Sequence, residues 1–225
     1  MVLTAAHCVD GASKARVILG AYDFAEEESG RVEVSSQEII IHPSWSPSTL
    51  ANDVALIKLT KNVEFSKNTS KMYFTNQLNF SCFLTDDQID KVNINDDPTE
   101  TEFIGQMATL TSWGLESETI SSQILKVAYP TILKKESCLI HDQISQICVE
   151  SVCGVSFLIS PVFVPNYNPK FNIQGNAGSP LHLLDNDYMI LIGVTSFGSS
   201  SGCEAGFPEV YTDVGFYYDW IQSNF

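Results

Sequence analysis

The sequence predicts an all-β protein with one helix at its C-terminal end. Short runs rich in Val, Ile, Leu, Thr and Tyr recur along the chain, and clusters of Gly, Pro, Asn or Ser separate them. Many short strands with turn residues between them are typical of a β-barrel or a β-sandwich, and the runs alone leave both open. The expected strands are Arg16–Leu19, Val32–Ile41, Val54–Leu59, Met107–Ser112, Leu125–Ile132, Tyr188–Val194 and Glu209–Thr212.

The expected helix runs from about Val214 to Ser223. Its apolar residues Phe216, Tyr217, Trp220 and Ile221 recur at near-helical spacing, which predicts one buried face. The chain has 225 residues, of which 44% are hydrophobic and 17% charged, so it is long enough to bury a sizeable core. Its length alone does not decide between one domain and two.

The net charge of −15 excludes some classes of partner. Phosphate groups are bound by clustered Lys and Arg side chains, so an acidic surface is not expected to bind nucleic acid or anionic lipid. The acidic run Glu26–Glu28 is expected to be a solvated loop face.

Targeting signals and cysteines indicate the compartment. No run of 18 or more apolar residues occurs, so no transmembrane helix is expected, and the N-terminus lacks the pattern of a signal peptide. Six cysteines stand singly at positions 8, 82, 138, 148, 153 and 203 without a C-x-x-C pair, so we expect no metal and no cofactor. Such spacing is typical of structural disulfides in an oxidising, extracellular environment.

Three short motifs occur in order along the chain. They are LTAAHC at Leu3–Cys8, NDVALIKL at Asn52–Leu59 and GNAGSPL at Gly175–Leu181. Together they resemble the histidine, aspartate and serine motifs of the trypsin/chymotrypsin (S1) family of serine endopeptidases, which read TAAHC, DIAL and GDSGGPL. The resemblance continues at TSWG (Thr111–Gly114), IC (Ile147–Cys148) and FPEVYT (Phe207–Thr212).

The run GVTSFGSSSGC at Gly193–Cys203 is most similar to the insect and crustacean chymotrypsin-like branch of that family. The resemblance implies two six-stranded antiparallel β-barrels followed by a C-terminal helix. Residues 1–105 would form the first barrel, incomplete at its N-terminus, and residues 106–225 the second barrel with the helix.

By this resemblance His7 is the general base and Asp53 the carboxylate that orients it. A hydroxyl is a poor nucleophile at neutral pH, so an imidazole must take its proton and a buried carboxylate must hold the correct tautomer. Without the motif, a lone histidine is more often a core residue, and an aspartate here would cap a strand. The remaining histidines, His42, His141 and His182, show no ligand spacing and are expected to be structural.

Ala177 stands at the family's nucleophile position and has no oxygen to attack a carbonyl. Loss of the serine alone costs about 10⁶-fold in turnover in subtilisin. Ser179 lies two residues further along a sharp turn, away from His7, and is expected to be a surface or packing residue. The resemblance places the oxyanion hole at Gly175 and Ala177.

Asn176 is a second departure from the family pattern. The family has an aspartate here, which forms a buried ion pair with the amino terminus created by activation cleavage and so orders the oxyanion hole. An amide has no charge for such a pair, and nothing in the chain matches the family's Ile-Val-Gly-Gly terminus. The sequence therefore predicts a remnant His7–Asp53 pair in a non-catalytic homologue.

The resemblance also outlines a substrate pocket. Its base is expected at Ser151, which is uncharged and would not select Lys or Arg. Glu209 stands at a wall position that is usually glycine, so it would narrow the pocket or make it acidic. Ser196 and Gly198 match positions that line the pocket, although an ordinary loop role fits each of these residues nearly as well.

The family frame implies the disulfides Cys138–Cys148 and Cys153–Cys203. The usual partner of Cys8 belongs to an N-terminal part that this chain lacks, and Cys82 has no family counterpart.

Two segments, residues 68–85 and 155–174, are rich in Phe, Asn and Ser and have no family counterpart. Removing residues 155–174 joins Gly154 to Gly175 at the family spacing. We favour retained introns in a gene model over real surface insertions, which the glycosylation sequons at Asn68 and Asn79 would fit. Either origin predicts poorly ordered segments that project from the barrels.

Three functions follow from these observations. The first is a non-catalytic homologue that binds a protein or peptide as a monomer. The second is an active serine endopeptidase whose true chain differs from this one. The third is a mis-predicted or decaying gene product that folds poorly, since an incomplete barrel exposes a strand edge.

Overall fold

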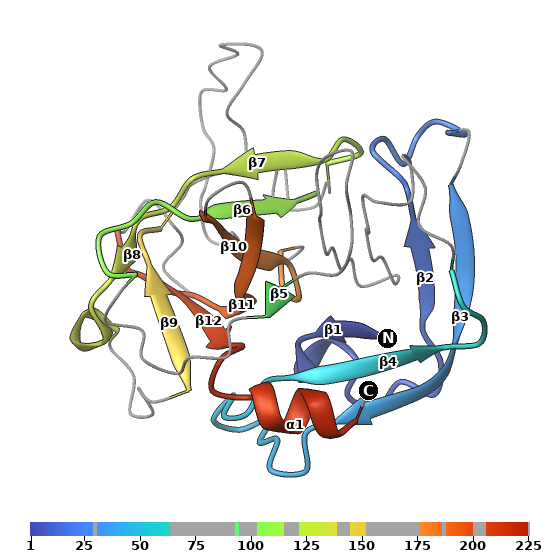
Figure 1. Ribbon diagram of the computed structural model, residues 1–225, viewed down its shortest axis with the longest axis horizontal. Coiled ribbons are helices and arrows are strands. Elements are labelled where there is room, and N and C mark those ends of the chain that lie inside the picture. The colour runs from blue at the N-terminus through green and yellow to red at the C-terminus, as the bar shows by residue number, and fades with distance from the viewer. Residues whose placement is uncertain are drawn as a thin grey trace.

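A computed structural model describes residues 1–28, 31–63, 93–94, 103–114, 122–138, 145–151, 176–185, 188–199 and 206–224. In this part of the chain, strands dominate and the one α-helix lies at the C-terminal end. The strands form two curled, mainly antiparallel sheets, which lie side by side in Figure 1. The predicted all-β class is therefore confirmed.

The first sheet has four strands among the described residues, in the order β1-β4-β3-β2. They are β1 (Val2–Thr4), β2 (Arg16–Leu19), β3 (Val32–Ile41) and β4 (Ala55–Leu59). Along β3, the buried residues Val34 and Ser36 alternate with exposed ones, because successive side chains of a strand point to opposite faces. β1 pairs antiparallel with β4 so that Thr4 faces Ala55, which brings the residues after β1 close to those before β4.

The second sheet has eight strands among the described residues, in the order β7-β6-β10-β11-β12-β9-β8, with β5 pairing parallel to β11. The predicted arrangement of two curled antiparallel sheets followed by a C-terminal helix is thus confirmed, and the described residues supply four strands to one sheet and eight to the other. The second sheet's strands are β5 (Asn93–Ile94), β6 (Thr109–Ser112), β7 (Lys126–Ala128), β8 (Ile132–Leu133), β9 (Gln146–Val149), β10 (Pro180–Asp185), β11 (Tyr188–Phe197) and β12 (Glu209–Asp213).

The helix α1 (Tyr218–Ser223) follows the last strand of the second sheet but lies beside the first sheet (Figure 1). Its residue Ile221, together with Val214 and Tyr217, belongs to the hydrophobic cluster that also holds Leu56 and Ile57 of β4. Burying one such side chain contributes about 1.5–3 kcal/mol. The C-terminal segment, which follows the second sheet, therefore packs against the first sheet and connects the two.

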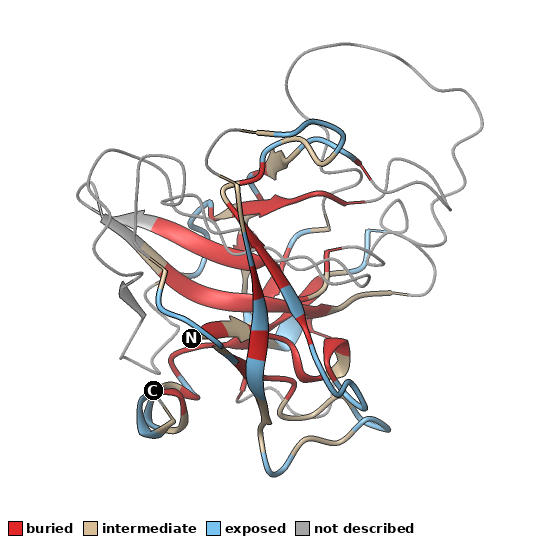
Figure 2. Cartoon of the chain, turned by 90° about the vertical axis from the view of Figure 1, so that its right-hand side faces the viewer, coloured by how far each residue is buried: buried red, intermediate tan, exposed pale blue. Residues whose placement is uncertain are grey.

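The apolar core has two main clusters, and the first also contains Leu191 and Val194 of β11 in the second sheet. The second cluster joins buried residues of the second sheet, including Leu110, Leu181, Ile192 and Tyr211. Figure 2 shows long buried stretches on the central strands and exposed residues near the turns. The division of the chain into barrels at residues 105 and 106 stays a prediction.

The strand prediction is accurate where the apolar pattern is long. β2 and β3 have the predicted bounds, and β4, β6, β11 and β12 overlap the predicted strands. The predicted strand Leu125–Ile132 is split into β7 and β8, with Pro130 between them, because proline cannot donate a ladder hydrogen bond. The predicted helix begins later, at Tyr218, after hydrogen-bonded turns at residues 214–217.

Candidate functional site

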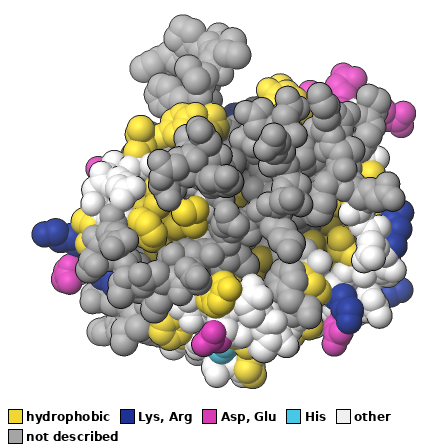
Figure 3. All heavy atoms as spheres, in the orientation of Figure 1, with side chains coloured by type: hydrophobic (Ala, Val, Ile, Leu, Met, Phe, Trp, Pro, Cys, Tyr) yellow, Lys and Arg dark blue, Asp and Glu magenta, His cyan; other side chains and the backbone are white. Residues whose placement is uncertain are grey.

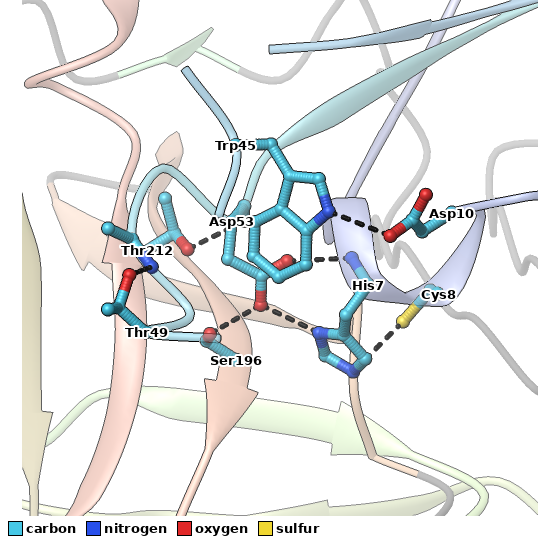
Figure 4. A network of polar contacts seen from close by, with 9 residues as sticks. His7, Cys8, Asp10, Trp45, Thr49, Asp53, Ser196 and Thr212 are labelled. Carbon is cyan, nitrogen blue, oxygen red and sulfur yellow. Dashed lines mark hydrogen bonds and ion pairs between the residues drawn. The ribbon is translucent and has the colours of Figure 1, made fainter. Parts of the chain in front are cut away.

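The site is centred on His7 and Asp53, which the β1–β4 pairing brings together. His7 lies in the 3₁₀ turn η1 (Ala6–Cys8) after β1, and Asp53 lies two residues before β4. The backbone N–H of His7 donates to Asp53 Oδ1 at 2.8 Å, and His7 Nδ1 lies 2.7 Å from Asp53 Oδ2 (Figure 4). Asp53 is buried, whereas the side chain of His7 is 30% exposed. The carboxylate thus fixes the imidazole at the edge of the core.

Ser196 completes the contacts of the Asp53 carboxylate. Its hydroxyl donates to Asp53 Oδ2 at 2.5 Å. The β11–β12 register shifts between Thr195 and Phe197, so Ser196 is the extra residue of a bulge. Bulges turn a side chain out of its regular direction, and here the side chain points at Asp53 (Figure 4). Ser196 is therefore a supporting hydroxyl for Asp53, in addition to its predicted place at the pocket.

The backbone around Asp53 is held by the C-terminal part of the chain. Thr212 Oγ1 donates to the Asp53 carbonyl oxygen at 2.8 Å, and Tyr217 Oη donates to Asn52 Oδ1 at 3.0 Å. Asn52 has a φ of 56°, in the left-handed region that asparagine tolerates better than most residues. The contacts of Thr212 and Tyr217 are not predictable from the sequence, because no local pattern reveals contacts between residues about 160 positions apart.

The second ring nitrogen of His7 faces a thiol. Nε2 lies 3.4 Å from Cys8 Sγ. Since Nδ1 is the nitrogen that faces the carboxylate, Nε2 is placed to accept a hydrogen bond. Burial, together with the negative charge of Asp53, raises the pKa of Cys8 well above its ordinary value. The thiol therefore stays protonated at neutral pH and is a poor nucleophile.

The loop that carries Ala177 connects to this pair through β11. Gly178 N donates to the Thr195 carbonyl oxygen at 2.8 Å, and Ser196 is the next residue along. Gly178 has a φ of 82°, which favours glycine. Ala177 is partly buried and packs against the first hydrophobic cluster. Gly175, the other predicted oxyanion-hole position, lies outside the described residues.

Ser179 is buried, and its hydroxyl donates to Ser112 Oγ at 3.0 Å. The structure thus places it inside the protein, as a packing residue and not a surface one. Asn176 is also buried, and its Oδ1 accepts a hydrogen bond from Ser112 Oγ at 2.7 Å.

The other predicted pocket residues lie on neighbouring strands at the same end of the second sheet. Ser151 follows β9, Gly198 follows β11, and Glu209 begins β12, the strand between them. Glu209 is buried, and Tyr211 Oη lies within hydrogen-bonding distance of its Oε2, at 3.3 Å. Burial, with the charge of Glu209, raises the pKa of Tyr211 well above its ordinary value, so the phenol remains a donor. The roles of these residues in a pocket stay a prediction.

One predicted disulfide and one further histidine, His182, lie in described strands or turns of the second sheet. The disulfide Cys138–Cys148 is formed as predicted. His182 is buried in β10, and burial lowers its pKa to about 4, so it is neutral in the folded protein. Cys82, His141, the predicted bond Cys153–Cys203 and the segments 68–85 and 155–174 lie outside the described residues.

The described surface carries neither a metal cluster nor a membrane helix. No group of three or more His, Cys, Asp or Glu side chains in the described ranges could hold a metal ion. No helix among the described residues is long and apolar enough to cross a membrane. On the face shown in Figure 3, the visible Lys and Arg side chains lie near the edges, with Asp and Glu side chains close to several of them.

Two curled antiparallel β-sheets, a C-terminal helix and a buried Asp53 that orients His7 are the architecture of the chymotrypsin-like serine proteases. The Trypsin family model matches residues 1–221. The chain therefore belongs to the trypsin family, as the sequence motifs predicted.

Named relatives agree with this assignment. The chain is 29% identical over 227 residues to brachyurin of Leptuca pugilator, covering 99% of this chain and 82% of that protein. It is 31% identical over 223 residues to a collagenase of Hypoderma lineatum, with 99% and 72% covered. The solved structure of HL collagenase matches with a TM-score of 0.69 and 32% identity, covering 99% of this chain and 80% of that one. The first two are a crustacean and an insect protein, as the Gly193–Cys203 run predicted.

Proposed function

We propose that this chain is a non-catalytic member of the trypsin family that binds a protein or peptide. The observation that carries the proposal is Ala177, at the position of the family's nucleophile, in a site that keeps His7 and Asp53 in hydrogen-bond contact. A base that is oriented by a carboxylate activates a hydroxyl only where a hydroxyl is present. His7 and Asp53 therefore have no hydroxyl to activate at position 177.

No described neighbour supplies a substitute nucleophile. The Ser179 hydroxyl is buried and donates to Ser112, so it is turned away from solvent. The Ser196 hydroxyl is committed to Asp53. Cys8 is buried and its pKa is raised, so little thiolate forms. Each candidate oxygen or sulfur therefore has a structural contact that opposes attack on a substrate.

The binding surface would be the former substrate cleft. Ser151, Ser196, Gly198 and Glu209 would line its pocket, with Glu209 as an acidic wall beside an uncharged base. A protein or peptide ligand follows from the family, and we expect a monomer in an extracellular compartment, where the Cys138–Cys148 disulfide is stable.

The alternative is an active serine endopeptidase whose chain carries serine at position 177. The retained His7–Asp53 contact and the names of relatives such as brachyurin, collagenase and chymotrypsin favour it. Under this alternative the departures at Asn176 and Ala177 would disappear from the corrected chain, while the dyad would remain.

Hydrolysis of casein and of a panel of chromogenic peptides by the purified chain tests the proposal. A matched His7→Ala variant gives the background rate. We expect the unaltered chain to hydrolyse no faster than this variant. Turnover that the His7→Ala substitution abolishes would overturn the proposal and favour the active alternative.

A further inference from the structure

The loop Asn176–Ser179 is held by hydrogen bonds between uncharged groups. Ser179 N donates to the Asn176 carbonyl oxygen at 2.9 Å, which closes the turn. Gly178 N donates to the Thr195 carbonyl oxygen at 2.8 Å, and Thr195 N donates to the Ser179 carbonyl oxygen at 2.9 Å. These bonds fix the backbone on both sides of Ala177 to strand β11.

Side chains continue this arrangement into the core. Ser112 Oγ, at the end of β6, donates to Asn176 Oδ1 at 2.7 Å. Ser112 Oγ also accepts hydrogen bonds from Ser179 Oγ at 3.0 Å and from Gly114 N at 3.3 Å. Ser112 and Ser179 are fully buried, and Asn176 is 6% exposed. Buried polar groups need partners, and these hydrogen bonds supply partners for Ser112 Oγ, Ser179 Oγ and Asn176 Oδ1.

Gly114 makes room for the Asn176 side chain. A Cβ atom placed on Gly114 would lie 2.9 Å from Asn176 Oδ1. Real Cβ atoms essentially never come this close to another heavy atom. The sequence thus combines an amide at 176, the Ser112 hydroxyl that donates to it, the Ser179 hydroxyl that donates to Ser112, and a glycine at 114 that leaves room for the amide.

We propose that the neutral network Ser112–Asn176–Ser179, which we call the amide network, orders the loop around Ala177 without an ion pair. The loop around Ala177 is then ordered without a newly generated amino terminus. This inference rests on the proposed binding function, since it explains how a binding surface exists without activation by cleavage.

The physical reason is the cost of burying charge. A carboxylate at 176 would need a cation to offset its desolvation, whereas an amide is satisfied by the hydroxyl of Ser112. Each hydrogen bond named in the network joins two uncharged groups, so its strength does not change with pH.

The test is to place a charge in the network. We expect Asn176→Asp to lower the melting temperature at pH 7.5 by about 5–10 °C. A buried acid without a cation has a raised pKa in the folded state, so the difference should shrink as the pH falls and the group protonates. Gln37→Glu, which adds the same charge at an exposed position of β3, is the matched control and should shift the melting temperature by under 2 °C.

Amide hydrogen exchange measures directly how well the loop Asn176–Ser179 is ordered. Ser112→Ala should weaken the protection of the Gly178 and Ser179 amides by about tenfold, since the network loses its centre. The exposed Ser13→Ala should leave both unchanged. Ser179→Ala removes only one arm of the network and gives a milder second variant if Ser112→Ala fails to fold.

Two results would overturn the inference. One is an Asn176→Asp variant that is more stable than the unaltered chain at pH 7.5, because a cation must then lie at the loop. The other is unchanged exchange at Gly178 and Ser179 in the Ser112 and Ser179 variants. Neither depends on hydrolysis or ligand binding, so failure here is distinct from failure of the proposed function.

Discussion

The polar centre around Asp53 and the polar centre around Asn176 are both buried, but one contains a carboxylate and the other an amide. The carboxylate of Asp53 accepts hydrogen bonds from the His7 backbone and from Ser196, and it orients the His7 imidazole. Asn176 sits among hydroxyls and makes no ion pair. The comparison indicates that a buried carboxylate orients the imidazole of His7, while the loop beside Ala177 is held by hydrogen bonds between uncharged groups.

Removing the carboxylate should have the largest effect. We expect Asp53→Ala to lower the free energy of unfolding by about 3–5 kcal/mol, because the His7 N–H and the Ser196 hydroxyl lose their buried acceptor. Urea unfolding followed by tryptophan fluorescence measures the change. Glu38→Ala, at an exposed position of β3, is the control and should stay within about 0.5 kcal/mol. Equal effects of the two substitutions would mean that the Asp53 centre is not a stabilising one.

Crowding the side-chain amide of Asn176 should have the second-largest effect on stability. Gly114→Ala places a Cβ against Asn176 Oδ1, and we expect a loss of about 1–3 kcal/mol. The double variant Gly114→Ala/Asn176→Ala relieves the contact, so the cost of the glycine substitution should fall when Asn176 is absent. An additive cycle would show that the two residues do not interact.

Asp213 is a second buried carboxyl group, and it extends the comparison between the Asp53 and Asn176 centres. Burial raises its pKa to about 6, although the backbone N–H groups of Phe216 and Gly215 and the charge of Lys135 oppose this shift. Since the folded-state pKa lies above the ordinary 3.8, the ionised group is disfavoured in the folded protein, and its cost to stability appears as the pH rises from about 4 to about 6. At Asp213, burial outweighs the two backbone donors and the charge of Lys135.

Asp213→Asn should therefore stabilise the protein at neutral pH. We expect a gain of about 1–2 kcal/mol at pH 7 that disappears near pH 4, because the asparagine oxygen still accepts from Gly215 N and carries no charge. Thermal unfolding across this pH range measures the gain. An equal gain at both pH values would contradict the raised pKa.

Much of the fold is predictable from local sequence. β2 and β3 have the predicted bounds because their apolar runs are bordered by turn residues. β1, β5, β9 and β10 were missed, since β1, β5 and β9 are short and β10 begins with Pro180 in a loop-like motif. The order of the described strands within the two sheets also follows from long-range pairing, which local pattern does not encode.

The residues of the site likewise divide into those that local sequence predicts and those that it does not. His7 and Asp53 were predictable, because each lies in a motif whose spacing is specific. The hydroxyl contacts of Ser196, Thr212 and Ser112 were not, because they depend on a bulge in β11 and on side chains that meet only in the folded chain. The contact between Cys8 and His7 depends equally on the turn η1.

Labelling with a fluorophosphonate probe, read by intact-protein mass spectrometry, tests the central claim most directly. The probe forms a bond with a serine oxygen only when a base has activated it. We predict no added mass on the folded chain, because no serine stands at position 177. One probe adduct per chain, mapped to a single serine and lost in the His7→Ala variant, would contradict the non-catalytic assignment.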